Sequence, residues 1–266
     1  MYSILTAFVI SVAIAISYVF VIFWGQNIKQ DRNDPQVIRG RIFRVTTLCV
    51  VLTAMLPILI QCFLNPYPTL LKSYQQLKIF QLPNSKDLQS ILLMCILYTG
   101  PIWNYFHSIN YDLAGWVQEC KEELTSIQGI RDLVFAPISE EVVYRSLILL
   151  VYQPLLQSGD LSTRSFITYT PLLFGIAHFN HGYVLYKVRK IDLAMVLFNG
   201  MVQFTYTSIF GMLANYLLLR NDSIYGSILV HSMCNLMGFP ELVPEMSELI
   251  YYPLLIVGPI AFYYYL

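Results

Sequence analysis

The chain has 266 residues, of which 56% are hydrophobic and 12% are charged, and its mean hydropathy is +0.57. Soluble domains average roughly 45–50% apolar and about 25% charged residues, so this composition excludes an ordinary soluble protein and favours a polytopic membrane protein. The formal net charge is zero, with 16 basic and 16 acidic side chains, and nothing indicates a nucleic-acid-binding surface. We therefore expect the partners of this protein to be in or beside the lipid bilayer.

Apolar segments recur along the whole chain. A helix needs about 20 mostly apolar residues to cross a bilayer, and this length predicts about eight transmembrane helices. The predicted spans are Ile4–Trp24, Val45–Leu64, Leu88–Phe106, Glu140–Leu156, Phe166–Phe179, Leu193–Leu219, Ile224–Phe239 and Leu249–Leu266. We find no internal repeat, linker or low-complexity tract, so we predict an all-α membrane bundle that folds as a single domain over residues 1–266.

Basic residues predict the orientation of these spans. They are densest between the first two spans, from Asn27 to Arg44, a loop that includes Lys29, and they recur from Lys187 to Lys190. The positive-inside rule places both loops in the cytosol, and strict alternation of eight spans agrees. Lys72 and Lys78 argue against this topology, because they fall in a loop that it places on the other side.

Two kinds of interruption are expected. Pro57, Pro101 and Pro253 lie inside apolar runs and predict kinks, which membrane bundles tolerate when neighbouring groups satisfy the freed carbonyls. The segment Asn110–Ile130 is polar enough to be a loop or an interfacial helix.

The fourth predicted span opens with two adjacent carboxylates, Glu140 and Glu141, at the mouth of an apolar run. Burying an unpaired charge is costly, so this pair needs partners. Arg145 lies four residues after Glu141 and shares its helix face, whereas Glu140 points about 100° away. We therefore expect Arg145 to hold Glu141. Pro137 and Ser139 predict that a helix begins here, with both carboxylates in its first turn.

Two later spans carry histidines at the same helical spacing. Phe174 and His178 are four residues apart in the fifth span, and His231 and Asn235 are four residues apart in the seventh. Small neighbours such as Gly175 permit close helix approach. The predicted topology places the start of the fourth span, the end of the fifth and the later half of the seventh toward the cytosol. Glu140, His178, His231 and Asn235 are therefore expected to converge at one depth.

This set of groups fits peptide hydrolysis. A carboxylate beside a histidine can take a proton from water, while a second histidine and an amide can donate to the developing oxyanion. The chain has no HExxH, no GxSxG and no intramembrane Asp pair, which argues against a zincin, a serine hydrolase or an aspartyl protease. A zinc site of Glu140, His178 and His231 has suitable ligand types. It would use the carboxylate that must act as the base, so we favour a mechanism without metal or cofactor.

Three motifs then indicate a family. EEVVYR preceded by AP, FGIAH followed by FNHG, and HSMCN followed by MGFP occur in this order between Arg131 and Pro240. They resemble the three motifs of the type II CAAX prenyl endopeptidases, integral membrane proteases of the CAAX-protease and bacteriocin-processing superfamily. One departure is Asn180 before His181, where the family pattern leads us to expect a histidine.

The resemblance implies cleavage of the peptide bond after the prenylated cysteine of a C-terminal CAAX sequence. The products would be a tripeptide and a shortened farnesylated or geranylgeranylated protein, such as a Ras-like or a-factor-like substrate. The resemblance also implies a multi-pass protein of the endoplasmic reticulum membrane, with the active site facing the cytosol. That side agrees with the side predicted from the basic loops.

The resemblance further implies roles for individual residues. Glu140 would be the general base for water, assisted by His178. His231 and Asn235 would form the oxyanion site. The supporting residues, which orient the catalytic helix or line the pocket, are Glu141, Arg145 and Phe174.

Two other functions stay open for the same residues. In a proton-coupled transporter, Glu140 and the two histidines would form a relay spread along the bilayer normal, whereas the predicted topology gathers them near one face. In a catalytically inert scaffold that binds prenylated tails, Glu140→Ala would leave function intact.

Overall fold

A computed structural model describes residues 2–26 and 30–266, so Lys29 of the predicted basic loop lies outside the described residues, as does the side chain of His181. All regular secondary structure in the described part of the chain is helical, which confirms the all-α prediction. The chain forms two compact units. The first comprises Met1–Leu82 and Ile138–Ile224, and the second comprises Pro83–Pro137 and Tyr225–Leu266. Whether both units act as one domain stays a prediction.

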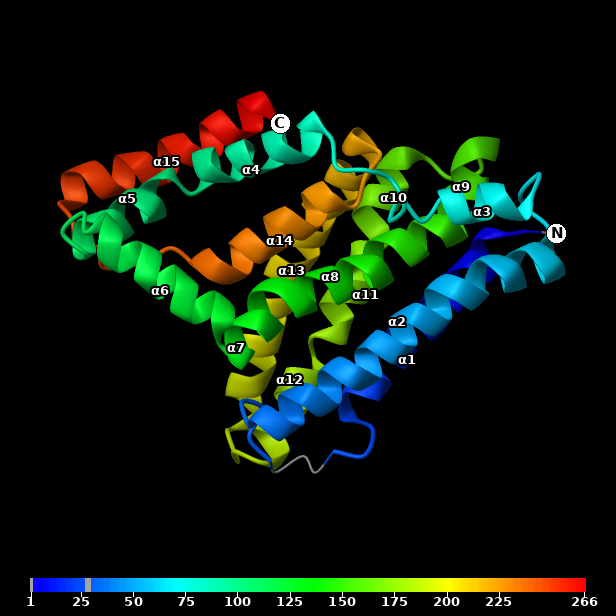
Figure 1. The fold of residues 1–266 in the computed structure, drawn as a ribbon, viewed down its shortest axis with the longest axis horizontal. Helices are drawn as coiled ribbons and strands as arrows, with labels where there is room; N and C mark the ends of the chain where they lie inside the picture. The colour runs from blue at the N-terminus through cyan, green and yellow to red at the C-terminus, as the bar shows by residue number, and fades with distance from the viewer. Residues whose placement is uncertain (1, 27–29) are drawn as a thin grey trace. The chain divides into compact units, whose positions relative to one another are not determined.

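The helices of each unit are drawn in Figure 1. The first unit contains α1 (Ile4–Phe23), α2 (Pro35–Leu64), α3 (Leu70–Gln75), the π-helical segment η2 (Val142–Leu147), α9 (Ile148–Ser158), α10 (Thr163–Tyr169), α11 (Pro171–Ala177), α12 (Asn180–Lys187) and α13 (Leu193–Asn221). The second contains α4 (Ser85–Leu97), α5 (Thr99–Ser108), α6 (Leu113–Thr125), α7 (Ile127–Gly129), the π-helical segment η1 (Ile130–Phe135), α14 (Tyr225–Met237) and α15 (Glu248–Tyr265). The short α8 (Ala136–Glu141) crosses the boundary between the units.

Among the described residues, three helices are long and apolar enough to cross a membrane, namely α1, α2 and α13. They correspond to the first, second and sixth predicted spans. Shorter helices occupy most of the other predicted spans. The third is divided into α4 and α5, the fifth into α10 and α11, and the seventh is the 13-residue α14. The polar segment after the third span is a helix, α6, with no buried residue.

Helix α2 begins earlier than predicted. Asp34 caps its first turn by accepting from the backbone N–H of Gln36, and Pro35 occupies the first helical position, where a missing N–H is tolerated. The predicted start at Val45 was therefore too late, and Arg39, Arg41 and Arg44, which had been placed in a loop, lie in the first three turns of the helix. One of them, Arg44, donates to the carbonyl of Val21 at 2.8 Å in the last turn of α1, which is a favourable place for a cation.

The helix that carries the two carboxylates is also longer than predicted. Segments α7, η1, α8, η2 and α9 follow one another without a break, and Ser126 caps the start by accepting from the N–H of Gly129. Pro137 and Ser139 therefore lie inside a helix, and the prediction that a helix begins there was wrong. A proline is accommodated because the preceding turn has π register, in which the N–H of Ala136 donates to the carbonyl of Arg131, five residues back.

Within the first unit, this helix forms the core. Every residue from Val143 to Tyr152 is buried, so the helix is covered on all its faces. Helices α1, α2, α11 and α13 all contact its η2 segment.

A side-chain hydroxyl compensates for the N–H that one proline lacks in a helix of the first unit. Pro154 in α9 has no N–H for the carbonyl of Leu150, and the phenol of Tyr67 donates to that carbonyl. The carbonyl freed by Pro154 is thus satisfied by a neighbouring group, in the way that membrane bundles tolerate helix prolines. The kinks predicted at Pro57, Pro101 and Pro253 stay predictions.

Candidate active site

The carboxylates Glu141 and Glu140 occupy different surroundings in the first unit. Glu141 and Arg145 form an ion pair with an Nε–Oε2 distance of 3.1 Å, and both side chains are 0% exposed. The predicted pairing four residues apart is thus present. Glu140 is only half-buried. Removing one partner of a pair as buried as Glu141 and Arg145 would leave an uncompensated buried charge, so each side chain requires the other.

The guanidinium of Arg145 also contacts aromatic rings from two other helices. It lies 4.7 Å from the ring centroid of Phe174 on α11 and 5.9 Å from that of Phe210 on α13. Its Nη1 donates to the carbonyl of Tyr144 at 3.3 Å. Cation–π contacts are strongest where water is excluded, as around this fully buried arginine. Phe174 is therefore buried against the supporting ion pair.

The tautomer of His178 follows from its contacts with Phe174. Nδ1 of His178 lies 2.7 Å from the carbonyl oxygen of Phe174, and a carbonyl only accepts. Nδ1 therefore carries a proton and donates, and in the neutral form of the imidazole Nε2 is the nitrogen with the lone pair. The two rings meet edge to face with centroids 4.5 Å apart. The orientation of this half-buried histidine is thus set by its contacts with Phe174.

Close helix packing supports this arrangement. A Cβ atom on Gly175 would lie 2.3 Å from Oγ of Ser208, so α11 can approach α13 this closely only with a glycine at that position. A Cβ atom on Gly211 of α13 would similarly lie 2.7 Å from Cβ of Pro171. The close approach predicted from the small residue at Gly175 is confirmed, and it sets the place of Phe174.

Two tyrosines near Glu140 were missed by the sequence reasoning. Tyr18 of α1 shares a hydrogen bond of 3.0 Å with Oγ of Ser139, and its ring meets that of Tyr144 with centroids 5.5 Å apart. Both phenols lie within electrostatic range of the Glu140 carboxylate. Tyr144 belongs to the EEVVYR motif and could have been considered. Tyr18 lies in the first apolar span, where no local pattern distinguishes it.

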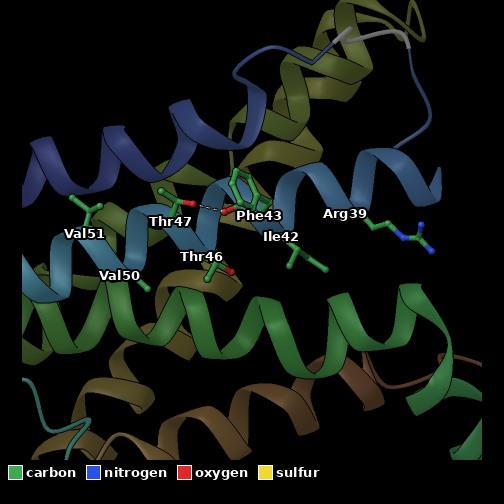
Figure 2. Close-up of a pocket in the computed structure, with 7 residues that line it drawn as sticks. All are labelled: Arg39, Ile42, Phe43, Thr46, Thr47, Val50 and Val51. Atoms are coloured by element: carbon green, nitrogen blue, oxygen red, sulfur yellow. Dashed lines mark hydrogen bonds between the residues drawn. The ribbon is translucent and has the colours of Figure 1, made fainter.

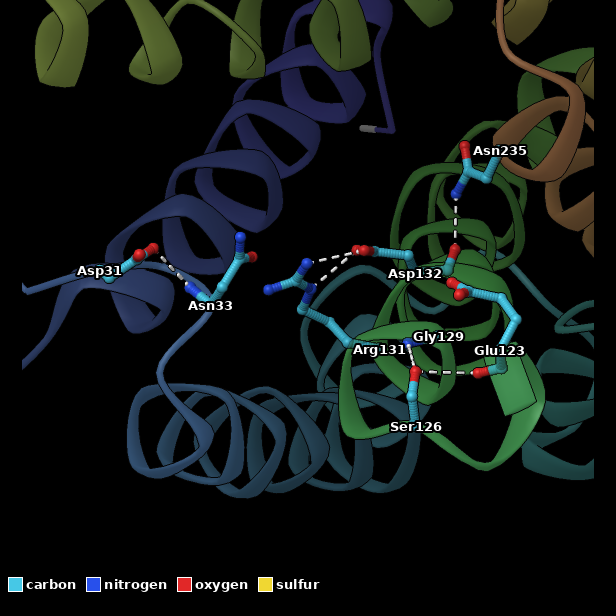
Figure 3. A network of polar contacts seen from close by, with 8 residues as sticks. All are labelled: Asp31, Asn33, Glu123, Ser126, Gly129, Arg131, Asp132 and Asn235. Carbon is cyan, nitrogen blue, oxygen red and sulfur yellow. Dashed lines mark hydrogen bonds and ion pairs between the residues drawn. The ribbon is translucent and has the colours of Figure 1, made fainter. Parts of the chain in front are cut away.

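The second unit carries the other two predicted site residues, both on α14. His231 is buried, with 6% of its surface exposed. Asn235, one turn later, is exposed and donates from Nδ2 to the backbone carbonyl of Asp132 at 2.8 Å, as Figure 3 shows. The carboxylate of Asp132 accepts from Nε and Nη2 of Arg131, at 2.7 and 2.6 Å.

The start of α14 is fixed by a buried carboxylate. Oδ1 of Asp87 accepts from the N–H of Gly226 at 2.9 Å, while its Oδ2 accepts from the N–H of Asn84 at 2.9 Å in the capping box of α4. Together with the Asn235 contact, this bond ties both ends of α14 to other elements of the second unit.

The first unit contains five predicted residues, of which Glu141, Arg145, Phe174 and His178 are connected by contacts and Glu140 is the neighbour of Glu141 in the chain; the second unit holds His231 and Asn235. Convergence of the two sets stays a prediction. Within each unit, the described residues include no group of three or more His, Cys, Asp or Glu side chains placed to hold a metal ion. The ligands of the alternative zinc site, Glu140, His178 and His231, come from both units. A chelation experiment is therefore the test of that site.

A separate pocket lies on one face of α2, as Figure 2 shows. Its lining residues are Arg39, Ile42, Phe43, Thr46, Thr47, Val50 and Val51. They include no carboxylate and no imidazole, so this surface offers no acid or base for hydrolysis.

Comparisons with known proteins agree with the motifs. A model of the family described as "Type II CAAX prenyl endopeptidase Rce1-like" matches residues 122–237. The "Probable CAAX prenyl protease 2" of Schizosaccharomyces pombe is 29% identical over 240 residues, which cover 88% of this chain and 81% of the relative. The "CAAX prenyl protease 2" of Saccharomyces cerevisiae is 28% identical over 255 residues, covering 88% and 80%. The Homo sapiens protein of that name is 30% identical over 164 residues, covering 59% and 48%. No solved structure matches.

Proposed function

Because residues 122–237 match the Rce1-like family model and the relatives that cover most of this chain are named as CAAX prenyl proteases, we propose that it is a membrane endopeptidase of the type II CAAX prenyl endopeptidase family, which removes the C-terminal tripeptide from prenylated CAAX proteins. The observation that carries this proposal is the division of labour between the two adjacent carboxylates. Arg145 pairs with Glu141, while the half-buried Glu140 is the residue that can meet water.

In the proposed reaction, Glu140 takes a proton from a water molecule, and the resulting hydroxide attacks the carbonyl carbon of the prenylated cysteine. His178 assists by accepting a hydrogen bond from the same water at Nε2, because its Nδ1 is already committed to the carbonyl of Phe174. His231 and Asn235 donate to the oxyanion of the tetrahedral intermediate. When the peptide C–N bond breaks, the proton held by Glu140 passes to the leaving amine.

The supporting residues have a role that requires no contact with substrate. Glu141 and Arg145 hold the helix around Glu140, and Phe174 connects that pair to His178 through its ring and its carbonyl. Misplacing a reacting group by about 1 Å can cost about 100-fold in rate, so such positioning contributes directly to catalysis.

We also propose the finer features of substrate, cofactor and location. The substrates are farnesylated or geranylgeranylated CAAX proteins, whose prenyl chain enters from the lipid phase because it is poorly soluble in water. The mechanism needs no metal, the two units act as one domain with eight spans, and the site faces the cytosol from the endoplasmic reticulum membrane. Accessibility of single cysteines introduced into the loops would test the topology.

The direct test uses purified protein in lipid nanodiscs and a synthetic farnesylated CAAX peptide. Mass spectrometry should detect the released tripeptide and the shortened farnesyl peptide. Glu140→Gln and His178→Ala should each lower kcat by about 100-fold or more, as expected for loss of a general base or its partner. Glu248→Gln is the matched control, because Glu248 is an exposed carboxylate in the first turn of α15.

Three outcomes would contradict parts of the proposal. Full activity in Glu140→Gln would exclude the proposed base, and a wild-type protein that binds the peptide without cleaving it would support the inert scaffold. Loss of activity with a chelator, restored by added zinc, would establish the metal alternative with Glu140, His178 and His231. The transporter alternative has no support among relatives named as proteases.

A further inference from the structure

The turn of helix before Pro137 has π register, and the proline removes the N–H that would continue this register. In η1 the N–H of Ala136 donates to the carbonyl of Arg131, five residues back. In the same register the next carbonyl, that of Asp132, would accept from the N–H of residue 137. Residue 137 is proline, which has no N–H. The π turn and the proline together therefore direct the Asp132 carbonyl to a partner outside the helix.

That partner is Asn235. Its Nδ2 donates to the Asp132 carbonyl at 2.8 Å from the last turns of α14 (Figure 3). The carbonyl is well fixed, because the carboxylate of Asp132 is held by both Nε and Nη2 of Arg131. A buried or half-buried carbonyl that loses its helical partner is expected to find another donor, and here the only side-chain donor described for it is this amide.

The bond determines which way the amide of Asn235 faces. A carboxamide has one acceptor oxygen and two N–H donors, and its two orientations are otherwise similar in shape. Because the carbonyl of Asp132 can only accept, the nitrogen must face it. One N–H is then committed, and the second N–H is held in a defined direction on a side chain that is exposed. A donor fixed before the reaction needs no reorganisation when negative charge develops.

We propose that Pro137 is a positioning residue for the hydrolysis, which acts through the Asp132 carbonyl to orient the amide of Asn235 with one N–H directed to the oxyanion. The inference rests on the proposed function for its kinetic consequence, but the backbone-to-amide bond itself exists independently of any activity. It also explains why a helix that carries the proposed base contains a proline three residues before it.

The test begins with Pro137→Ala, which supplies the missing N–H and gives the Asp132 carbonyl a donor within its own helix. The amide of Asn235 should then lose its fixed orientation. We expect kcat on a farnesylated CAAX peptide to fall about 10-fold, with KM changed less than about twofold. The melting temperature should stay the same or rise, since proline is unfavourable inside a helix. If Pro137 had only a structural role, Pro137→Ala would instead lower the melting temperature and leave kcat unchanged.

A double-mutant cycle tests the bond without using activity. In the wild-type background, Asn235→Ala should lower the melting temperature by about 2–4 °C, because it leaves a carbonyl without a partner. In the Pro137→Ala background the same substitution should change it by less than about 1 °C. Equal decreases in both backgrounds would overturn the proposal. If the wild-type protein cleaves no prenylated peptide, the proposed function fails, and the cycle still reports on the bond.

Two further variants keep the test decisive. Pro154→Ala is the matched control, since it removes a proline from the same helical run far from Asn235 in sequence, and it should leave kcat unchanged. Should Pro137→Ala fail to fold, Asn235→Asp replaces the amide by a group of equal size that cannot donate when ionised. A melting temperature as low as that of Asn235→Ala supports the bond, and one equal to wild type overturns it.

Discussion

Two prolines in one helical run interrupt it in chemically similar ways and are compensated differently. Pro154 frees the carbonyl of Leu150, which accepts from the phenol of Tyr67, a side chain of the loop after α2. Pro137 frees the carbonyl of Asp132, which accepts from the amide of Asn235 on α14. In both places the sequence removes one backbone donor, and a residue far along the chain supplies another.

The two sites differ in whether the compensating side chain has a hydrogen-bond donor left after this bond has formed. Tyr67 is 4% exposed and has a single hydroxyl proton, which the Leu150 carbonyl uses. Burial raises the pKa of the Tyr67 phenol, so the group stays a neutral donor. Asn235 is exposed and has a second N–H. One proline thus produces a closed structural contact, and the other leaves an oriented polar group available for chemistry.

The largest expected effect concerns the ion pair of Glu141 and Arg145, which lie between the two prolines in sequence. Arg145→Met would leave the Glu141 carboxylate buried and uncompensated, which should lower the free energy of unfolding by about 3–5 kcal/mol. Denaturation of the purified protein would measure the loss. The double variant Arg145→Met with Glu141→Leu is the control, because it removes both charges and should recover most of the stability. A double variant no more stable than the single one would show that the pair does more than balance charge.

The second prediction distinguishes the two compensating side chains, Asn235 and Tyr67, by the effect of each substitution on kcat. Asn235→Ala should lower kcat by about 100-fold to 1000-fold, since it deletes an oxyanion donor. Tyr67→Phe should leave kcat within about twofold of wild type, since its phenol serves only the helix. Steady-state hydrolysis of a farnesylated CAAX peptide measures both. A comparable loss of kcat in both variants would mean that the two proline sites differ less than proposed.

Local periodicity was enough to predict the parts of the site that lie on one helix. The pairing of Glu141 with Arg145 follows from a spacing of four residues, and the close packing at Gly175 follows from its lack of a side chain. The first depends on neighbours in sequence, and the second was predicted from the residue type alone. The all-α class followed from composition for a similar reason, because apolar runs of this length satisfy their backbone groups as helices.

Contacts between distant segments could not be predicted in this way. Nothing in the first span distinguishes Tyr18 as a neighbour of Ser139, and nothing near Tyr67 indicates its bond to Leu150. The predicted helix start at Pro137 was wrong because proline usually marks a first turn, whereas here a π turn before it accommodates the missing N–H. Register changes of this kind depend on packing partners that a single segment does not contain.

A moderate effect on stability is expected from Tyr67→Phe. The Leu150 carbonyl would lose its donor inside a buried helix, which should lower the free energy of unfolding by about 1–2 kcal/mol at neutral pH. A phenol whose pKa is higher in the folded than in the unfolded state contributes stability that is complete below pH of about 10 and declines above it. The difference between wild type and Tyr67→Phe should therefore shrink above about pH 10. A difference that grows at alkaline pH would contradict the assigned role of the phenol as donor.

The smallest effect is expected when the proline and its compensating side chain are changed together. Pro154→Ala supplies a backbone N–H for the Leu150 carbonyl, so in that background Tyr67→Phe should change the free energy of unfolding by less than about 0.5 kcal/mol. Denaturation of the four members of this cycle measures the coupling. The cycle at Pro137 and Asn235 should show the same loss of coupling in stability, but only there should kcat also fall. If Pro154→Ala lowered kcat as Pro137→Ala is expected to do, the proline near Glu140 would have no special connection to catalysis, and both residues would simply shape the helix.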